Sequence, residues 1–261
     1  MKNITLKKVA EVCRGSLHGG AEREEEATCV VIDSRKLKAG GIFIAARGAA
    51  VDGHSFIPQA AAQKALGVVC EKAPSESEIP GDFPYILVED SFQALKDIAE
   101  YYRSQLDLPV IGITGSVGKT STKEFIAAVL SAKYRVLKTE GNFNNEIGLP
   151  LTVLSIRTEH EAAVLEMGIS DFGEMHRLSK IARPDVVVMT NIGQSHLETL
   201  GSREGILKAK SEIFDFMNPK GCVFVNGDDD LLCHMREKGG RRVLHFGQNP
   251  ANEIFASDLE S

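Results

Sequence analysis

The sequence has no excess of positive charge and no long apolar run. Lysine and arginine number 30 against 36 aspartates and glutamates, which gives a formal net charge of −6. Without a basic footprint, nucleic acid is not expected as the main partner, and any anion site must be built locally. No stretch approaches the roughly 20 apolar residues of a membrane span, and lysines interrupt the apolar residues of the first segment. We therefore expect a globular, cytoplasmic protein.

Cysteine is also scarce, and its spacing excludes two kinds of site. The cysteines are odd in number and include no Cys-x-x-Cys pair: Cys13, Cys29, Cys70, Cys222 and Cys233. This pattern argues against a disulfide framework and against a zinc cluster. We interpret these residues as free, mostly buried thiols. The sequence likewise contains no internal repeat and no low-complexity tract.

What the chain does contain is enough apolar material for two modest domains. Of its 261 residues, 43% are hydrophobic, which suffices for a full core in one large or two smaller domains. Residues 1–88 predict a small α/β domain, with residues 73–84 as a proline-punctuated loop inside it. A helical pattern over 91–105 then opens the second predicted domain, residues 89–261.

In the second domain, apolar strand patterns alternate with helical patterns. The predicted strands are residues 110–114, 135–137, 162–166, 185–190, 222–225 and 242–246. Such alternation predicts a mostly parallel sheet covered by helices on both faces. The fold class is therefore α/β, and ligands are expected beyond the carboxyl ends of the strands.

A glycine-rich turn at residues 112–120, Gly-Ile-Thr-Gly-Ser-Val-Gly-Lys-Thr, joins a strand pattern to a helical pattern. This arrangement typically cradles nucleotide phosphates, because glycines let backbone amides approach and the helix presents its positive end. Lys119 would add a full charge, and Thr120 would add a hydroxyl for magnesium. The strict P-loop pattern has glycine where this chain has Ile113, and the glycines fall at 112, 115 and 118 instead. A turn without a ligand explains the motif less well.

Polar residues follow several predicted strands, and each has an ordinary alternative. Glu166 could hold magnesium or lie in a surface turn. His196 could be a metal ligand or an acid/base group, although a lone loop histidine is more often solvated. Lys210 lies in a predicted helix whose lysines would ordinarily face solvent. The segment 226–229, Asn-Gly-Asp-Asp, follows another strand, where an aspartate could instead cap a helix.

Residues 139–150 are dense in side-chain amides. Asn142, Asn144 and Asn145 are three of four consecutive residues. Turn chemistry explains some of them, but this density is more than a turn needs. The segment follows the strand predicted beside the glycine-rich turn, so we expect it near the phosphate site.

Together these motifs resemble the Mur ligases, ATP-dependent amide-forming enzymes of peptidoglycan precursor synthesis. The shared motifs, in the family's order, are Gly-x-x-Gly-x-x-Gly-Lys-Thr at 112–120, Glu166-Met167-Gly168, Asn191 with His196, Ala209-Lys210-x-x-Ile213-Phe214 and Asn226-x-Asp228-Asp229. The first is similar to the family's own P-loop, which accounts for Ile113. Residues 33–56 resemble the segment with which these ligases receive a UDP-sugar. The asparagine-rich segment narrows the resemblance to the branch that adds D-alanyl-D-alanine.

The resemblance implies a small N-terminal α/β UDP-sugar-binding domain and a mostly parallel-sheet P-loop ATPase domain. The residues that it implies for ATP are Gly115, Ser116, Val117, Gly118, Lys119, Thr120, Ser121, Asn226 and Asp228. Magnesium would be held by Thr120 and Glu166, with His196 on a second magnesium ion. The lysine that corresponds to Lys210 is carbamylated in this family, which converts a cation into a carboxylate-like group. Lys119, His196 and Lys210 form the implied catalytic set.

The implied reaction joins D-alanyl-D-alanine to UDP-N-acetylmuramoyl-tripeptide through an acyl phosphate. The implied substrate residues are Ser34, Arg35, Gly48, Asp52, His54, Asn142, Asn144 and Asn145. Family members continue for roughly 200 residues more than this chain. We therefore expect the C-terminal domain to be absent and turnover by this chain alone to be small. We also expect a monomer without a nucleic-acid partner or a membrane span.

Three other interpretations remain open. A sister ligase would add a diamino acid to the UDP-sugar dipeptide, or glutamate to folate. The asparagine-rich segment disfavours both, and Asp33-Ser34-Arg35 disfavours the folate enzyme. A P-loop switch that hydrolyses or senses nucleotide is disfavoured by Ile113 and by the lack of a clear apolar run ending in a metal-binding aspartate. The third is a structural or interaction role for the chain by itself.

Overall fold

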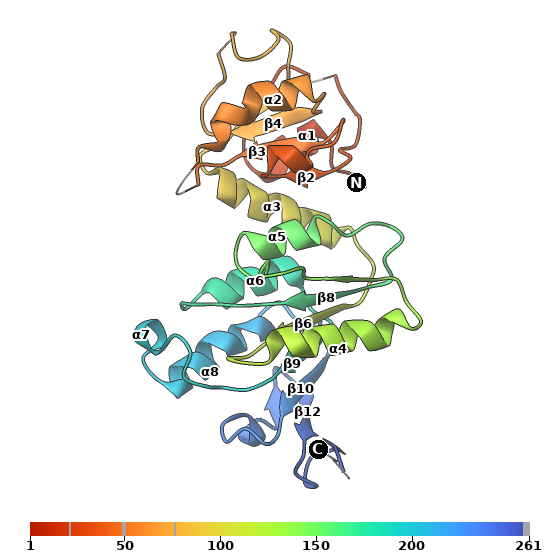
Figure 1. Ribbon diagram of the computed structural model, residues 1–261, viewed down its shortest axis with the longest axis vertical. Coiled ribbons are helices and arrows are strands. Elements are labelled where there is room, and N and C mark those ends of the chain that lie inside the picture. Colours follow the sequence, from red (N-terminus) through yellow and green to blue (C-terminus); the bar gives the residue numbers. More distant parts are fainter. Residues whose placement is uncertain (21, 49–50, 76, 258–261) are drawn as a thin grey trace. The chain divides into compact units, whose positions relative to one another are not determined.

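The computed structural model (Figure 1) describes residues 1–20, 22–48, 51–75 and 77–257. The chain divides into two compact units. The first is Met1–Leu106 with Val153–Arg157, and the second is Asp107–Thr152 with the residues from Thr158 onward. Among the described residues, no helix combines the length and the apolar character that crossing a bilayer requires.

The first unit contains a five-stranded, mostly parallel sheet with the order β1-β5-β4-β3-β2. The strands are β1 (Ser16–His18), β2 (Val30–Val31), β3 (Ile42–Ala45), β4 (Gly67–Cys70) and β5 (Tyr85–Leu87). Of these described strands, β1 runs antiparallel, beside β5, and the sequence pattern does not predict it. Every residue of β3 and β4 is buried, as expected for parallel strands covered on both faces.

Helices and short 3-10 turns surround this sheet. They are α1 (Leu6–Val12), η1 (Ser34–Lys36), η2 (Gly53–Phe56), α2 (Ile57–Ala62) and α3 (Ser91–Ser104). Ile57 of α2 joins Phe43 and Val68 of the sheet in one hydrophobic core. The hydroxyl of Thr5 caps α1 by accepting a hydrogen bond from the amide of Lys8 (3.2 Å), which fixes the start of this helix.

The boundary between the units lies later than the prediction placed it. The prediction ended the first domain at residue 88, whereas the first unit extends to Leu106 and includes α3. α3 packs on α1, β3 and β4, and the hydroxyl of Tyr102 donates to the carbonyl of Ile156 (2.7 Å) in the same unit. Hydrophobic spacing shows that a helix has an apolar face, but not which sheet that face covers.

The second unit contains the predicted parallel sheet. Its strands are β6 (Val110–Thr114), β7 (Val136–Lys138), β8 (Ala162–Glu166), β9 (Val186–Met189), β10 (Cys222–Asn226), β11 (Glu237–Lys238), β12 (Arg241–Gly247) and β13 (Ile254–Phe255). Their order is β11-β12-β10-β9-β6-β8-β7, with β13 paired to β12. The six predicted strands are confirmed. The two-residue strands β11 and β13 carry too short a pattern to be predicted.

Strand β6 lies where the direction of chain progress through this sheet reverses. After β6 the chain runs to β7 and returns to β8 on one side, whereas β9, β10 and β12 follow on the other side. In sheets of this kind, ligands bind in the crevice beyond the carboxyl ends of the strands at the reversal point. The loops after β6, β8 and β9 meet there.

Helices cover both faces of the second sheet. The described helices of this unit are α4 (Lys119–Ser131), α5 (Gly148–Val153), α6 (Glu174–Ala182), α7 (Leu197–Leu200) and α8 (Arg203–Ser211), with 3-10 turns η3 (Glu212–Phe214) and η4 (Leu232–His234). α4 packs on β6, β7 and β8, with Ala127 against Ile111 and Ile113. Gly112 points to the opposite face, where Ile213 of η3 lies against it.

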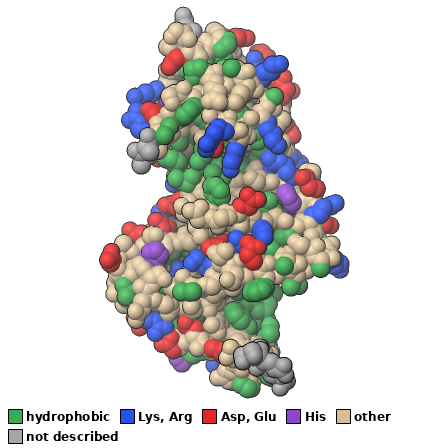
Figure 2. Space-filling view, in the orientation of Figure 1, with side chains coloured by type: hydrophobic (Ala, Val, Ile, Leu, Met, Phe, Trp, Pro, Cys, Tyr) green, Lys and Arg blue, Asp and Glu red, His purple; other side chains and the backbone are tan. Residues whose placement is uncertain are grey.

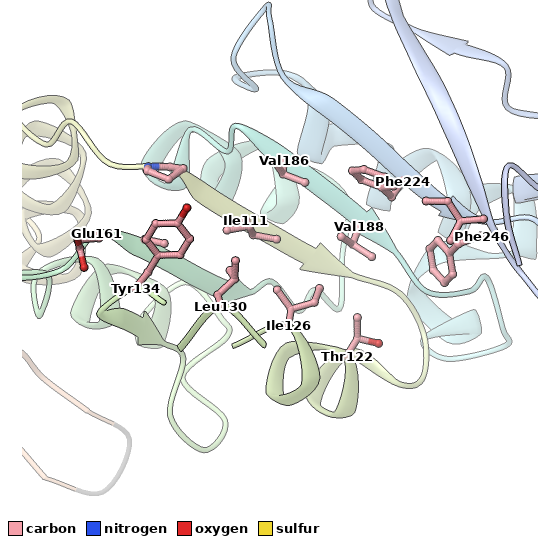
Figure 3. A pocket seen from close by; sticks show the side chains of 13 residues that line it. Ile111, Thr122, Ile126, Leu130, Tyr134, Glu161, Val186, Val188, Phe224 and Phe246 are labelled. Atoms are coloured by element: carbon pink, nitrogen blue, oxygen red, sulfur yellow. The ribbon is translucent and has the colours of Figure 1, made fainter. Parts of the chain in front are cut away.

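An apolar cavity of about 600 Å³ lies beside α4, where this helix leaves part of the sheet uncovered. Figure 3 shows Ile126 and Leu130 of α4 facing Ile111 and Val188 of the sheet. The space-filling view shows hydrophobic side chains gathered toward the lower end of this face (Figure 2). The lining includes few polar groups, namely Thr122, Tyr134 and Glu161. This cavity therefore lacks the cations and amides that a phosphate site requires.

Candidate functional site

The glycine-rich turn joins β6 to α4 and contains two glycines whose backbone conformations disfavour a side chain. Gly115 has φ +150°, and Gly118, the N-cap of α4, has φ +81°. A Cβ at Gly115 would lie 1.9 Å from Oγ1 of Thr190 and 3.1 Å from the amide nitrogen of Asn191. The residues after β9 thus pack closely against the turn. Position 115 requires glycine both because of its backbone conformation and because there is no room for a Cβ.

Asn191 holds the turn in its shape. Its Oδ1 accepts hydrogen bonds from the amides of Ser116 (3.1 Å) and Val117 (2.8 Å). Asn191 reaches these two amides from the end of β9, and the predicted contact of Ser116 and Val117 with the nucleotide stays a prediction. The first-turn amides of α4, from Lys119 to Ser121, have no acceptor within the helix. They remain the predicted phosphate donors.

The ammonium of Lys119 lies over the turn. It donates hydrogen bonds to the carbonyls of Gly115 (2.8 Å) and Ser116 (3.4 Å). Burial lowers the pKa of Lys119, and the nearby carboxylate of Glu166 opposes this shift. A partly desolvated ammonium attracts a phosphate group more strongly than one surrounded by water.

Glu166, the last residue of β8, is the centre of a polar cluster. It is 2% exposed, so the alternative that it lies in a surface turn is wrong. Its Oε2 accepts a hydrogen bond from the hydroxyl of Thr120 (2.9 Å), and its Oε1 accepts one from Nδ2 of Asn144 (2.7 Å). A carboxylate and a hydroxyl are the hard oxygen ligands that Mg²⁺ prefers, so this pair fits the predicted magnesium ion.

A pocket of about 450 Å³ brings four of the predicted residues together. Lys119, Asn144, Asn145 and His196 line it. The other lining residues come from the same loops and from α6, namely Glu146, Ile147, Gly168, Ile169, Ser170 and Glu174. The walls therefore belong to the segments that follow β6, β7, β8 and β9, as the parallel sheet predicts.

His196 is exposed at the edge of this pocket. It precedes α7 and has a left-handed backbone conformation with φ +63°. No three histidine, cysteine, aspartate or glutamate side chains within the described ranges form a metal-binding group. His196 lines the pocket, whereas Glu166 is not among its lining residues. Its role on a second magnesium ion stays a prediction.

Lys210 is buried, so the expectation that a helix lysine faces solvent is wrong here. It lies on the inner side of α8 and is 1% exposed. Burial, followed by the positive charge of Lys119, lowers the pKa of Lys210 to about 8. A lowered pKa increases the fraction of neutral amine near neutral pH, and the neutral amine is the form that reacts with CO₂.

Two predicted nucleotide residues after β10 are engaged within the fold. The carboxylate of Asp228 accepts hydrogen bonds from the amides of Gln248 (2.6 Å) and Asn249 (3.0 Å), which hold the pKa of Asp228 below its usual value. The amide of Asp228 donates to Oδ1 of Asn226 (3.0 Å). These contacts give both residues a structural role that the motif did not reveal, and nucleotide contact by either stays a prediction.

Asp229 forms a turn just before η4, whose N-cap is Leu231, so the helix-cap alternative for this segment is not confirmed. Its Oδ1 accepts hydrogen bonds from the amides of Leu231 (3.0 Å) and Leu232 (2.9 Å) at the start of η4. Its Oδ2 accepts one from the amide of Ile192 (2.8 Å) in the loop after β9. Asp229 therefore joins the ends of two strands beside the pocket.

The three predicted asparagines have different surroundings. Asn144 contacts Glu166, as described above. Oδ1 of Asn145 accepts hydrogen bonds from the amides of Ile147 (3.2 Å) and Gly148 (2.8 Å) at the start of α5, so it has a turn-forming role as well as a place in the pocket. Asn142 is exposed and is not part of the pocket lining.

In the first unit, the side chains of Asp52 and His54 contact each other in the segment after β3. The carboxylate of Asp52 contacts Nδ1 of His54 at 2.7 Å, and Nε2 of His54 accepts a hydrogen bond from the amide of Glu71 (3.0 Å). Because Nε2 accepts, the ring proton is on Nδ1 and is donated to Asp52. A hydrogen bond from the His54 amide is the largest of the effects that lower the pKa of Asp52 to about 2. This pair therefore has a structural role in the loop, and contact of either residue with the substrate stays a prediction.

The other predicted sugar-binding residues also lie beyond strand ends. Arg35 is exposed, and its guanidinium pairs with the carboxylate of Asp33 (2.9 and 2.8 Å). Ser34 is buried and donates to Oε1 of Gln59 (3.2 Å). The amide of Gly48 donates to the carbonyl of Val51 (2.9 Å). Of these groups, the guanidinium suits a diphosphate, and all three roles stay predictions.

Three polar residues of the site were not predicted as functional. Asn191 was noted only as a motif residue, and no rule assigned its side chain to the turn. Thr139 follows β7, and its hydroxyl accepts a hydrogen bond from the amide of Glu166 (3.0 Å). Lys123 is buried on the sheet-facing side of α4. Its four-residue spacing from Ala127 could have identified it, because such residues share one helix face.

Comparison with known proteins identifies the family. The model for the Mur ligase middle domain matches residues 113–261, and the model for the Mur ligase family catalytic domain matches residues 26–103. A UDP-N-acetylmuramoyl-tripeptide–D-alanyl-D-alanine ligase from Bacillus subtilis is 46% identical over 228 residues, which cover 87% of this chain and 50% of the relative. The chain thus spans about half the length of the curated relatives that it matches.

Solved structures agree with this assignment. MurF from Acinetobacter baumannii superposes with a TM-score of 0.86 at 34% identity, over 98% of this chain and 56% of that one. MurF ligase from Thermotoga maritima in complex with ADP gives 0.76 at 35% identity, over 88% and 52%. With a middle-domain match that covers more than half of its residues, the chain belongs to the Mur ligase family.

Proposed function

We propose that this chain is part of an ATP-dependent ligase that joins D-alanyl-D-alanine to UDP-N-acetylmuramoyl-tripeptide. The observation that carries the proposal is the grouping of Lys119, Thr120 and Glu166 at the carboxyl ends of β6 and β8. The Bacillus subtilis relative has this activity in its name, and the Thermotoga maritima structure contains ADP. A cytoplasmic location and a monomeric state belong to the same proposal.

The reaction requires two negatively charged groups to approach each other. A carboxylate oxygen of the tripeptide attacks the γ-phosphorus of ATP, the bond to the β–γ bridging oxygen breaks, and acyl phosphate and ADP form. The amine of D-alanyl-D-alanine then attacks the acyl carbon, phosphate leaves, and the nitrogen releases a proton. Lys119 would offset the phosphate charge during the first step, with the first-turn amides of α4 as fixed donors.

Thr120 and Glu166 are the residues that would hold Mg²⁺, which supplies further neutralisation of phosphate charge when bound. Their oxygens are 2.9 Å apart and face each other. Asn144 holds the second oxygen of Glu166 and so fixes the plane of the carboxylate. The chain therefore presents a preorganised oxygen pair beside the phosphate turn.

The lowered pKa of Lys210 predicts a pH-dependent stability. The folded chain releases this proton near pH 8, whereas an unfolded lysine retains it up to about pH 10.5. Between these values the unfolded state binds more protons, so this group raises the free energy of unfolding as pH rises, by up to about 3 kcal/mol. Urea unfolding in CO₂-free buffer at pH values at both ends of this window measures the change. The increase in unfolding free energy from the lower to the higher pH should be larger for wild type than for Lys210→Met. Equal gains would contradict the burial argument.

We propose that Lys210 is carbamylated when CO₂ is present. The neutral Nζ attacks the carbon of CO₂ and loses a proton, which leaves a carboxylate-like group near Lys119. Support comes from the burial of Lys210 and from its lowered pKa. The same pair of proteins tests this step: intact mass under CO₂ should increase by one CO₂ for wild type but not for Lys210→Met. If Lys210 were unmodified in a fully active ligase, a role for its carbamylation in the reaction would be excluded.

Ligand protection tests the proposed substrate. UDP-N-acetylmuramoyl-tripeptide at a hundredfold excess over Kd should raise the melting temperature by roughly 5–10 °C. The matching dipeptide is the control for a sister ligase and should stabilise the chain less. GTP is the control for a P-loop switch. Stabilisation by GTP alone would favour the switch and remove the ligase proposal.

The extent of the chain bears on turnover. It spans about half the length of its relatives, so we propose that it supplies the UDP-sugar and nucleotide sites. Catalysis with D-alanyl-D-alanine would then need the remaining half. D-alanyl-D-alanine-dependent phosphate release from these 261 residues alone would contradict this division.

A further inference from the structure

Lys123 is a buried cation beneath the phosphate turn for which the proposed reaction has no use. It lies on the inner face of α4 and is 1% exposed. Its ammonium donates to the carbonyl of Thr139 (2.8 Å) and lies 3.1 Å from Oε1 of Glu124. It is also 3.9 Å from Oε2 of Glu166, which makes it the ion-pair partner of Glu166 in the described part of the chain.

The oxygen that Lys123 approaches is the one shared with Thr120. Oε2 of Glu166 accepts the hydroxyl of Thr120 (2.9 Å), and Oε1 is taken by Asn144 (2.7 Å). The backbone amide of Glu166 donates to the hydroxyl of Thr139, whose carbonyl holds the Lys123 ammonium. Lys123 and Glu166 are thus fixed against each other through one residue at the end of β7.

Stability alone does not explain this placement. Removing an ammonium and a carboxylate from water is costly, and well-packed apolar residues commonly replace such a pair without loss of stability. The ammonium instead affects the charge at Oε2. A fixed positive charge near that oxygen offsets the negative charge of the carboxylate. It also repels any second cation that approaches the same oxygen.

We propose that Lys123 is a positioning residue for Glu166 that makes metal binding depend on nucleotide. This inference rests on the proposed nucleotide and magnesium site. With Lys123 as its counter-ion, Glu166 binds Mg²⁺ weakly by itself, and the phosphates of a bound nucleotide supply the additional negative charge that makes binding favourable. By linkage, removal of the Lys123 charge strengthens the binding of Mg²⁺ without nucleotide.

The test is a Mg²⁺ titration of the 261-residue chain, read by thermal unfolding with and without ADP. Lys123→Gln removes the charge and retains a donor for the Thr139 carbonyl. Without ADP, the Mg²⁺ concentration for half-maximal stabilisation should fall by about tenfold or more in this variant. Lys123→Arg, which restores the charge, should return it toward the wild-type value. Lys133→Met, which removes an exposed lysine just after α4, should leave it unchanged.

The possible outcomes are distinguishable. A lower melting temperature of Lys123→Gln with an unchanged Mg²⁺ midpoint would show a purely structural role and overturn the inference. If wild type responds to neither ADP nor Mg²⁺ with ADP, the proposed function fails, and the inference fails with it. If Lys123→Gln does not fold, the double variant Lys123→Met/Glu166→Gln removes both charges and should fold. With ADP present, an Mg²⁺ midpoint of that double variant equal to wild type would also overturn the inference, because Glu166 would then not be the metal ligand.

Discussion

The Gly115→Ala variant is expected to lose about 3–5 kcal/mol of unfolding free energy, as the sum of steric overlap and backbone strain. The added Cβ would lie 1.9 Å from Oγ1 of Thr190, and it would be placed on a residue with φ +150°. Thr190 cannot turn away at no cost, because its hydroxyl donates to the carbonyl of Val117 (2.5 Å). Urea unfolding followed by circular dichroism measures the loss.

The matched control for this variant is Gly141→Ala. Gly141 also has a positive φ, +51°, but a Cβ there would meet no atom within 4 Å. The control therefore carries backbone strain without the clash and should lose about 1–2 kcal/mol. Equal losses in the two variants would show that the contact with Thr190 is unimportant. Nucleotide binding should weaken in Gly115→Ala but not in Gly141→Ala, because of these two glycines only Gly115 lies in the glycine-rich turn.

Lys119→Met is expected to weaken ADP binding by about 10- to 100-fold, which is the usual value of a charge-assisted hydrogen bond to phosphate. Methionine keeps most of the side-chain length and removes the charge. The ammonium contacts the carbonyls of Gly115 and Ser116, and burial already lowers its pKa. Removal of this partly desolvated ammonium should leave the melting temperature unchanged or slightly raised. Isothermal titration calorimetry measures the affinity.

The control for this second variant is Lys208→Met. Lys208 is an exposed lysine on α8, so its removal changes the net charge equally without affecting the turn. Its ADP affinity should match wild type. If both variants lost affinity equally, the effect would reflect overall charge. If Lys119→Met bound ADP as wild type does, the assignment of Lys119 to phosphate would be wrong.

The strand–turn–helix at residues 112–120 illustrates what local sequence predicts well. β6 has the predicted limits, and α4 begins at Lys119 directly after the last glycine of the motif. The glycine pattern, the apolar strand and the helical spacing are all short-range features, and each is satisfied by neighbours within about ten residues. The convergence of Lys119, Asn144 and His196 on one pocket follows from the same reasoning applied to a parallel sheet.

The partners of individual side chains were less predictable. Asp228 and His54 accept hydrogen bonds from backbone amides of their own unit, which no motif contains, and their roles at the nucleotide and at the sugar stay predictions. The amides of Ser116 and Val117 likewise donate to Asn191, and the contact of these two residues with nucleotide stays a prediction. In each case the observed partner is a group distant in sequence, which no local pattern contains.

By itself, the sequence determined the fold class, the six main strands of the second sheet and the family of this chain. The periodicity of apolar residues and the spacing of glycines encode these features locally. The tertiary structure alone decided that α3 belongs to the first unit and that Lys123 and Lys210 are buried. The physical reason is that burial depends on which surfaces pack together. A lysine on a helix carries the same local signal whether its face meets water or a carboxylate.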